Sequence, residues 1–201
     1  MYSLPTQITI NDNIYSIRNK GDFRMVLDCF SALNDVELNE QFRLYTALFI
    51  FYEDIELGEL DDMITQIENL FGADLEKAVS EMYNFFNCGE DSIGARTSYK
   101  LIDWEKDEQL LVGAINSVAG TEIRALPYLH WWTFMGYFCN IKDDCALANV
   151  TSIRYKIAKG KKLEKYEREF KQNNPQYFVW DRRTAEQKAE DELLESLWNK
   201  T

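Results

Sequence analysis

The segment 125–141 is the densest run of large apolar side chains in the sequence, and it carries the only histidine, His130. Pro127 suits the first turn of a helix, where its missing N–H costs nothing. From Tyr128 onward, large apolar residues recur at helical spacing and also fill the other sides, which is typical of a helix buried over most of its surface. A membrane span needs about 20 predominantly apolar residues, and this run is shorter and includes His130 and Asn140. We therefore expect a buried aromatic helix at the centre of the fold.

A short β-hairpin is predicted at about residues 5–18. Isoleucines alternate on both sides of the turn-rich trio Asn11–Asp12–Asn13, which is a hairpin pattern. An isolated two-stranded hairpin is marginally stable in water, so its apolar face must pack on helices or on the sheet of another chain. Packing within the chain is the simpler interpretation. The alternative is a partner-binding edge, for which Ile8 and Ile10 are the candidate residues.

Amphipathic patterns predict helices through most of the remaining sequence. Asp22 and Asn39 are predicted to cap the first two helices, because a side-chain oxygen at this position accepts a hydrogen bond from the first turn. Apolar stripes predict two further helices, at about 60–71 and 75–86. The second of these is expected to end near Cys88–Gly89, where glycine accepts the left-handed conformation of a helix terminus.

The second half of the sequence mixes helical signals with others. Asp103 is predicted to cap a helix that Gly120 ends. The segment Lys156–Lys171 is locally basic, and we interpret it as a solvated helix face, with a site for an acidic partner as the alternative. Around the start of this segment, three apolar residues alternate with other residues as they do in a short strand: Ile153, Tyr155 and Ile157.

Residues 179–201 are predicted to form an acidic helical tail. Asn173–Asn174–Pro175 ends the preceding helix, and Thr184–Ala185–Glu186–Gln187 has the form of a capping box. Apolar residues on one side of the predicted helix would be unusual on a free tail. We expect them to dock on the chain's own domain or in a groove of another protein. These candidate partner-binding residues are Leu193, Leu194, Leu197 and Trp198.

The composition bounds the fold and the class of partner. With 201 residues, 46% of them hydrophobic, the chain can bury one substantial core. We predict a mainly α (α+β) fold, with a helical bundle-like domain at 1–178 around the aromatic helix and with the short N-terminal hairpin. The formal net charge of −12 argues against binding to nucleic acid or to an anionic membrane, since phosphate binding needs clustered lysine and arginine. No signal-peptide pattern begins the sequence, so a cytoplasmic protein is expected.

The sequence contains no pattern that is typical of catalysis. His130 is a lone histidine, and we expect a hydrogen-bonded core residue rather than a base. A catalytic or metal role would need Cys139, Cys145 or acidic residues beside it, because nucleophilic catalysis requires a nucleophile, a base and an orienting acid. The four cysteines lack zinc-site spacing, and the acidic clusters lack the spacing of a calcium loop. We expect no enzyme activity, cofactor or metal.

One phrase, YLHWWTFMGYF, is highly distinctive, and shorter motifs accompany it: Asp103–Trp104–Glu105–Lys106–Asp107, LLVGAI, SIRYKI, ITINDNIYSI, Asp22–Phe23–Arg24 and Cys88–Gly89. Together these motifs resemble the bacteriophage gene-product-15 family of tailed phages and prophages. Genes of that family lie between the tail-tube and tape-measure genes. The resemblance therefore implies a tail-assembly chaperone in the cytoplasm of the host bacterium.

Three functions are compatible with these observations. The resemblance favours a chaperone that binds and shields the tape-measure protein until tail-tube subunits polymerise around it. Its further partners would be the tail-tube protein, a second tail-assembly chaperone, or other copies of itself in a homo-oligomer. The alternative is a structural tail or connector component that stays in the virion. An enzyme or metal protein built on His130 has the least support.

Overall fold

The computed structural model of the chain describes residues 3–55, 60–90, 99–179 and Gln187. Short 3-10 turns connect several of its main elements. The strands and α-helices, in chain order, are β1 (Gln7–Ile10), β2 (Asn13–Ser16), α1 (Phe23–Asn34), α2 (Glu40–Phe51), α3 (Leu60–Phe71), α4 (Leu75–Phe86), α5 (Glu108–Ala119), α6 (Trp131–Cys139), α7 (Ala146–Ala158) and α8 (Lys165–Asn173).

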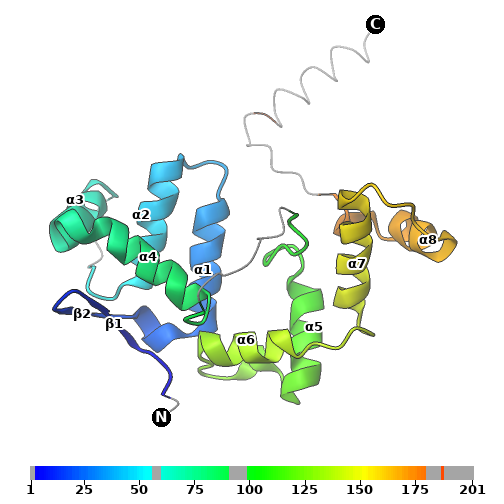
Figure 1. Cartoon of the computed structure of the whole chain (residues 1–201), viewed down its shortest axis with the longest axis horizontal. Helices are drawn as coiled ribbons and strands as arrows, with labels where there is room; N and C mark the ends of the chain where they lie inside the picture. The colour runs from blue at the N-terminus through cyan, green and yellow to red at the C-terminus, as the bar shows by residue number, and fades with distance from the viewer. Residues whose placement is uncertain (1–2, 56–59, 91–98, 180–186, 188–201) are drawn as a thin grey trace, which may run out of the picture.

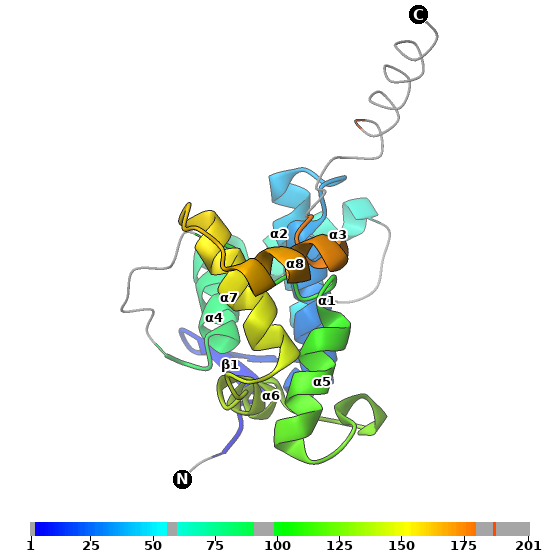
Figure 2. The ribbon, with the colours of Figure 1, turned by 90° about the vertical axis from the view of Figure 1, so that its right-hand side faces the viewer.

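The helices fall into two groups (Figure 1). We call the hairpin, α1 to α4 and α6 the N-terminal lobe, because they share one apolar core. We call α5, α7 and α8 the C-terminal lobe, and α5 connects it to the first lobe by packing on α6. In the side view, α8 lies across α7 (Figure 2), and Lys156 Nζ is 2.5 Å from Glu167 Oε1 at their contact. The predicted fold class is confirmed: the protein is mainly helical, with an N-terminal hairpin and a buried aromatic cluster.

The hairpin is present where the sequence predicted it. Strands β1 and β2 pair in antiparallel register. Asn11 turns the chain between them with a φ of 52°, a left-handed conformation that asparagine adopts more readily than most residues. The Asn11 side chain donates to Asp74 Oδ1 at 2.8 Å and accepts from Lys77 Nζ at 2.7 Å. These bonds fasten the hairpin turn to the start of α4.

Local capping signals place the ends of the first helices. Asp22 Oδ1 accepts a hydrogen bond from the backbone N–H of Arg24 at 3.0 Å, and Asn39 Oδ1 accepts one from Phe42 at 2.9 Å. Both caps satisfy amide groups that the first helical turn leaves without an internal partner. After α4, the chain takes positive φ angles of 60° and 72° at Cys88–Gly89. The predicted starts of α1 and α2 and the end of α4 are confirmed.

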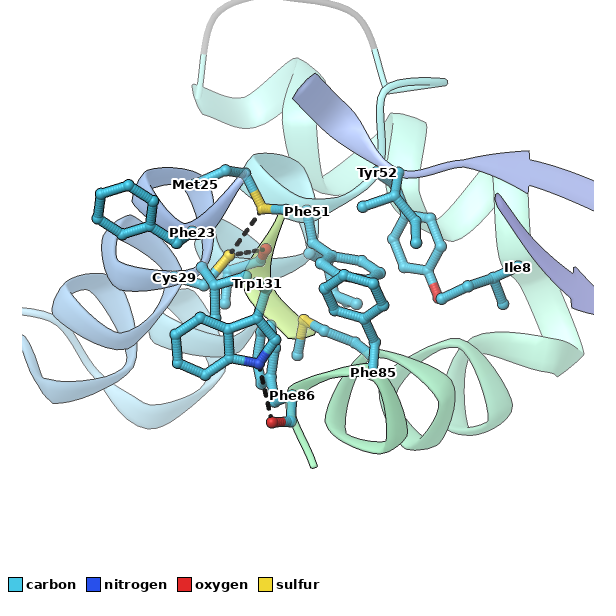
Figure 3. Close-up of a cluster of buried hydrophobic side chains, with 14 of the residues drawn as sticks. Ile8, Phe23, Met25, Cys29, Phe51, Tyr52, Phe85, Phe86 and Trp131 are labelled. Atoms are coloured by element: carbon cyan, nitrogen blue, oxygen red, sulfur yellow. Dashed lines mark hydrogen bonds between the residues drawn. The ribbon is translucent and has the colours of Figure 1, made fainter. Parts of the chain in front are cut away.

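The core of the N-terminal lobe combines aliphatic side chains with a cluster of aromatic ones (Figure 3). Trp131 is 1% exposed, and its indole Nε1 donates a hydrogen bond to the carbonyl oxygen of Phe86 at 2.9 Å. Phe51 stands edge-on to Tyr52 and to Phe85, with ring centroids 4.9 and 5.4 Å apart. Such pairs add about 0.5–1.5 kcal/mol beyond the burial of their area. The aromatic segment therefore reaches the centre of the fold through Trp131.

Helix α6 is shorter and less buried than the sequence indicated. It begins at Trp131 rather than near Pro127, and His130 is its N-cap, with Nδ1 accepting a backbone N–H from the first turn at 3.0 Å. The residues just before it stay extended, because the backbone N–H of Leu129 donates to Asp22 Oδ2 at 2.9 Å. Only two side chains of α6 are fully buried. The helix lies at the edge of the lobe and covers the core with one face.

The predicted start of α5 is wrong by several residues. The helix begins at Glu108, whereas Asp103 caps only a preceding turn by accepting a hydrogen bond from the backbone N–H of Lys106 at 3.2 Å. Asp107 occupies the N-cap position of α5, and its side chain makes no capping hydrogen bond there. It instead points inward and pairs with Arg154, so a tertiary contact determines where the helix can begin. Gly120 ends α5 with a φ of 70°, as predicted.

Helix α7 replaces the short extended run expected around Ile153. The alternation of three residues was misleading, because a stripe with helical spacing faces the interior of the C-terminal lobe. Its buried members include Leu147, Val150, Ile153 and Arg154.

None of the helices in the described part of the chain has the length and hydrophobicity that a membrane span requires.

Candidate functional site

The hairpin residues proposed as partner contacts lie inside the fold. Ile8 is 9% exposed and Ile10 is fully buried, because β1 packs on α4. These two side chains therefore offer little exposed surface in the folded chain, and the contact of the hairpin with a partner stays a prediction. The predicted capping box, apart from Gln187, and the candidate residues of the tail lie outside the described residues: Leu193, Leu194, Leu197 and Trp198.

His130 has a structural environment. It is 1% exposed, its Nε2 lies 2.9 Å from the carbonyl oxygen of Pro5, and its Nδ1 caps α6. Burial lowers the pKa of His130 below its ordinary value. Cys139 is exposed at the far end of α6, and the Cys145 thiol accepts the backbone N–H of Ala148 at 3.4 Å as the cap of α7. The geometry therefore gives His130 and Cys145 capping roles.

The other sequence candidates lie on the surface or at helix starts. Among the described residues, no cluster of histidine, cysteine or acidic residues has the geometry of a metal site. In the basic segment, Lys165 Nζ is 3.9 Å from Glu169 Oε1, and the Lys159 ammonium lies 4.5 Å from the ring centre of Tyr155. Tyr166 is 62% exposed. The segment is nevertheless not one solvated helix face, because it runs from the end of α7 into α8 and its Glu167 is buried against Lys156 where the two helices meet.

A groove of about 940 Å³ lies between the two lobes. One wall consists of the second half of α1, residues 35–38 of the connection that follows and part of α2, and the other wall is the segment 100–108 that leads into α5. Half-buried apolar side chains in a concave surface are typical of a binding groove. Here both walls contribute them: Leu27, Phe30, Val36, Leu38, Ile50, Ile102 and Trp104.

Acidic side chains stand on both walls of this groove. They are Asp28 and Asp35 on the α1 wall, and Asp103, Glu105 and Glu108 on the opposite wall. Lys100 and Lys106 belong to the same lining, and Lys100 Nζ lies 2.8 Å from Asp103 Oδ2. The Asp28 carboxylate has no hydrogen bond or ion pair with another described residue, and partial burial raises its pKa. The groove therefore combines an apolar floor, formed by the half-buried hydrophobic side chains of both walls, with an excess of negative charge.

A buried ion pair holds the second wall in place. Arg154 and Asp107 have side chains that are 6% and 1% exposed, and two guanidinium nitrogens bond the carboxylate at 2.5 and 2.8 Å. Arg154 also donates to the carbonyl oxygens of Leu101, at 2.9 Å, and Tyr177, at 2.5 and 2.8 Å. Asp107 accepts the backbone N–H of Asp103 at 2.9 Å. One guanidinium thus connects the groove wall, α7 and the segment after α8.

Trp104 joins the groove floor to the aromatic core. Its ring centroid lies 5.8 Å from that of Phe30 in α1, 5.9 Å from that of Trp131 and 5.3 Å from that of Phe138 in α6. The indole therefore contacts the N-terminal lobe while its backbone belongs to the wall of the C-terminal lobe. Its position links the shape of the groove to the packing of the core.

A model of one protein family covers most of the chain. The family described as Bacteriophage Gp15 protein matches residues 1–178. The chain belongs to this family. The resemblance seen in the sequence motifs is confirmed, and the molecule is a bacteriophage protein. No curated protein and no solved structure matches the chain.

The motifs that indicated the Gp15 family meet one another in the fold. Asp22 of the Asp22–Phe23–Arg24 motif accepts a hydrogen bond from the backbone just before α6, and Asp107 of the DWEKD motif pairs with Arg154 of SIRYKI. The sequence patterns had predicted no role for this pair. The available signal was a single arginine at a position of the apolar stripe of α7. In this Gp15-family protein, the motifs shape the two lobes and the groove between them.

Proposed function

We propose that this Gp15-family protein is a tail-assembly chaperone, which binds and shields the tape-measure protein in the host cytoplasm while the tail tube polymerises. The observation that carries the proposal is the open groove with an apolar floor in a phage protein of formal net charge −12. Such a groove can cover an apolar stripe of another chain, and the surrounding negative charge keeps the resulting complex soluble.

The physical problem that such a chaperone would solve is the exposure of apolar surface on a long helical chain. Contiguous apolar stripes promote aggregation unless another surface covers them. Many copies of a small protein, each bound weakly at its own segment, can cover a long chain and still be displaced one at a time. A groove that is open to solvent suits this reversible binding better than a closed pocket.

Co-expression with the tape-measure protein encoded beside this gene tests the proposal. We expect the tape-measure protein to become soluble and to co-elute with several copies of this chain in size exclusion with light scattering. Recovery of the tape-measure protein only in the insoluble fraction, with this chain eluting alone, would argue against a chaperone.

Mass spectrometry of purified virions separates the chaperone from a structural tail or connector component. A chaperone leaves when tube subunits replace it, so we expect this chain to be absent from the particle or strongly depleted. Presence at the stoichiometry of the tail proteins would support the structural alternative instead.

A further inference from the structure

We infer that the groove between the lobes binds one α-helix of a partner, whose apolar stripe is flanked on both sides by lysine or arginine residues. This inference rests on the proposed function, because the tape-measure protein would supply the helix. It adds the chemical character of the recognised segment, the surface that binds it and the residues that select it.

The apolar floor favours a helix over an extended segment. Its hydrophobic side chains come from α1, α2 and the wall that contains Ile102 and Trp104, and no strand lies beside the groove among the described residues. An extended segment gains most from backbone hydrogen bonds to a sheet edge, whereas an amphipathic helix gains from side chains at i, i+3, i+4 and i+7 inserted between apolar walls. The groove offers the second kind of contact.

The negative charge on the walls favours positively charged residues beside the apolar stripe of the partner helix. Carboxylates stand on both walls, and the Asp28 carboxylate has no cationic partner among the described residues, while its partial burial raises its pKa. A lysine or arginine placed beside it would relieve that cost and would also speed association. Because Asp28 and Glu105 lie on opposite walls, cations are needed on both sides of the stripe.

The same charges argue against two other occupants. A second copy of this chain carries a net charge of −12, so two copies repel each other at an acidic groove. The tail 179–201 has more acidic than basic residues and meets the same repulsion. A basic amphipathic helix from another protein is the occupant that both the floor and the walls favour.

The direct test uses the full chain and a fluorescent probe peptide of about 18 residues, or roughly five helical turns. The peptide carries leucines along one stripe and lysines on both sides of it, and a twin peptide carries glutamates in place of the lysines. The groove variant is Asp28→Lys with Glu105→Lys. The matched control is Asp143→Lys with Asp144→Lys, which makes the same change in formal charge on an exposed turn outside the groove.

We expect the lysine peptide to bind the wild-type chain and the control with similar affinity, and to bind the groove variant at least tenfold more weakly in fluorescence anisotropy. The glutamate peptide should not bind. Hydrogen exchange should show protection by the peptide at residues 27–38 and 100–108. Equal weakening in the groove variant and the control would overturn the inference, because net charge alone would then explain binding. Protection of the groove that grows with protein concentration without peptide would also overturn it, by identifying a second copy as the occupant.

Co-expression with the tape-measure protein distinguishes this inference from the proposed function. If the wild-type chain and the groove variant solubilise the tape-measure protein equally, the groove is not the binding surface, although the chaperone role stands. If the lysine peptide binds in the groove but the wild-type chain leaves the tape-measure protein insoluble, the groove inference stands and the chaperone role fails. Thermal melts of both variants verify that each is folded.

Discussion

The two lobes of the molecule are stabilised in different ways. Almost all of the buried hydrophobic side chains belong to one cluster, which is centred on the N-terminal lobe. The separate cluster of the C-terminal lobe has a small buried centre, Leu111, Ala114 and Leu147. What positions α7 against the start of α5 is the buried pair of Asp107 and Arg154, with its hydrogen bonds to two carbonyl groups.

This difference shows how a protein can separate stability from the geometry of a binding surface. Burial of apolar area is non-directional and adds up over many contacts, so the N-terminal lobe supplies most of the free energy of folding. A buried ion pair contributes little net stability relative to apolar residues of the same shape. It does require a defined geometry, and here that geometry positions one wall of the groove.

Replacement of Trp131 by alanine should have the largest effect on stability. Removal of a fully buried tryptophan costs about 3–5 kcal/mol in free energy of unfolding, and the loss of its hydrogen bond to Phe86 adds to this. Denaturant unfolding followed by circular dichroism measures the change. Tyr166→Ala, at a side chain 62% exposed, is the control and should change stability by less than about 0.5 kcal/mol. Similar effects for the two variants would contradict a dominant aromatic core.

Replacement of Arg154 by methionine should come next, at about 3 kcal/mol, because Asp107 is left as a buried charge without its partner. The damage should stay local. Hydrogen exchange should become faster at 100–108 and in α7, with little change in α1 and α2. The double variant with Asp107→Leu should recover much of the loss, since no unpaired charge remains. If the double variant recovers no stability, the ion pair contributes to the free energy of folding as well as positioning the groove wall.

Alanine substitutions at two glycines with similar backbone angles, one in each lobe, distinguish the cost of steric crowding from the cost of backbone strain. Gly21 has a φ of 78° and a Cβ there would lie 2.7 Å from Phe85 Cζ, whereas Gly120 has a φ of 70° and open space around it. Gly120→Ala should cost about 1 kcal/mol from the left-handed backbone alone. Gly21→Ala should cost about 1–3 kcal/mol more, because it also overpacks the core. Equal melting temperatures for the two variants would contradict the tight packing of the N-terminal lobe.

His130 should give the smallest effect and one that depends on pH. The ring donates from Nε2 to Pro5 and accepts at Nδ1, which requires the neutral form, and burial lowers its pKa below the ordinary value of 6.5. The folded state therefore binds a proton less tightly than the unfolded state. The contribution of His130 to the free energy of unfolding is therefore fully present above pH 6.5, and it is lost as the pH falls from 6.5 toward the lowered pKa.

Denaturation midpoints between about pH 7.5 and 5.5 measure this dependence across the range in which histidine titrates. His130→Asn keeps an acceptor at the cap but cannot titrate, so its pH dependence should be flatter than that of the wild-type chain. An unchanged slope in the variant would assign the pH dependence to titratable groups other than His130.

Structural features that depend on only a few neighbouring residues were predicted well from the sequence. Asp22 and Asn39 cap α1 and α2, and Gly120 ends α5, because a cap depends on the side chain and backbone of one helical turn. The start of α6 was predicted poorly. Pro127 gave a strong local signal, but His130 caps the helix after Leu129 has bonded to Asp22 across the lobe. A contact between distant residues overrode the local preference.

The helical class, the hairpin, the aromatic centre and the family could be predicted from the sequence alone, because periodicity, caps and dense motifs are properties of short stretches of chain. The burial of Ile8 and Ile10 and the presence of the groove depend on how distant segments pack, so they became known only from the folded structure. It also brought Asp107 to Arg154 across 47 positions of sequence. The free energy of such a pair depends on distance and burial, and neither can be calculated until the chain has folded.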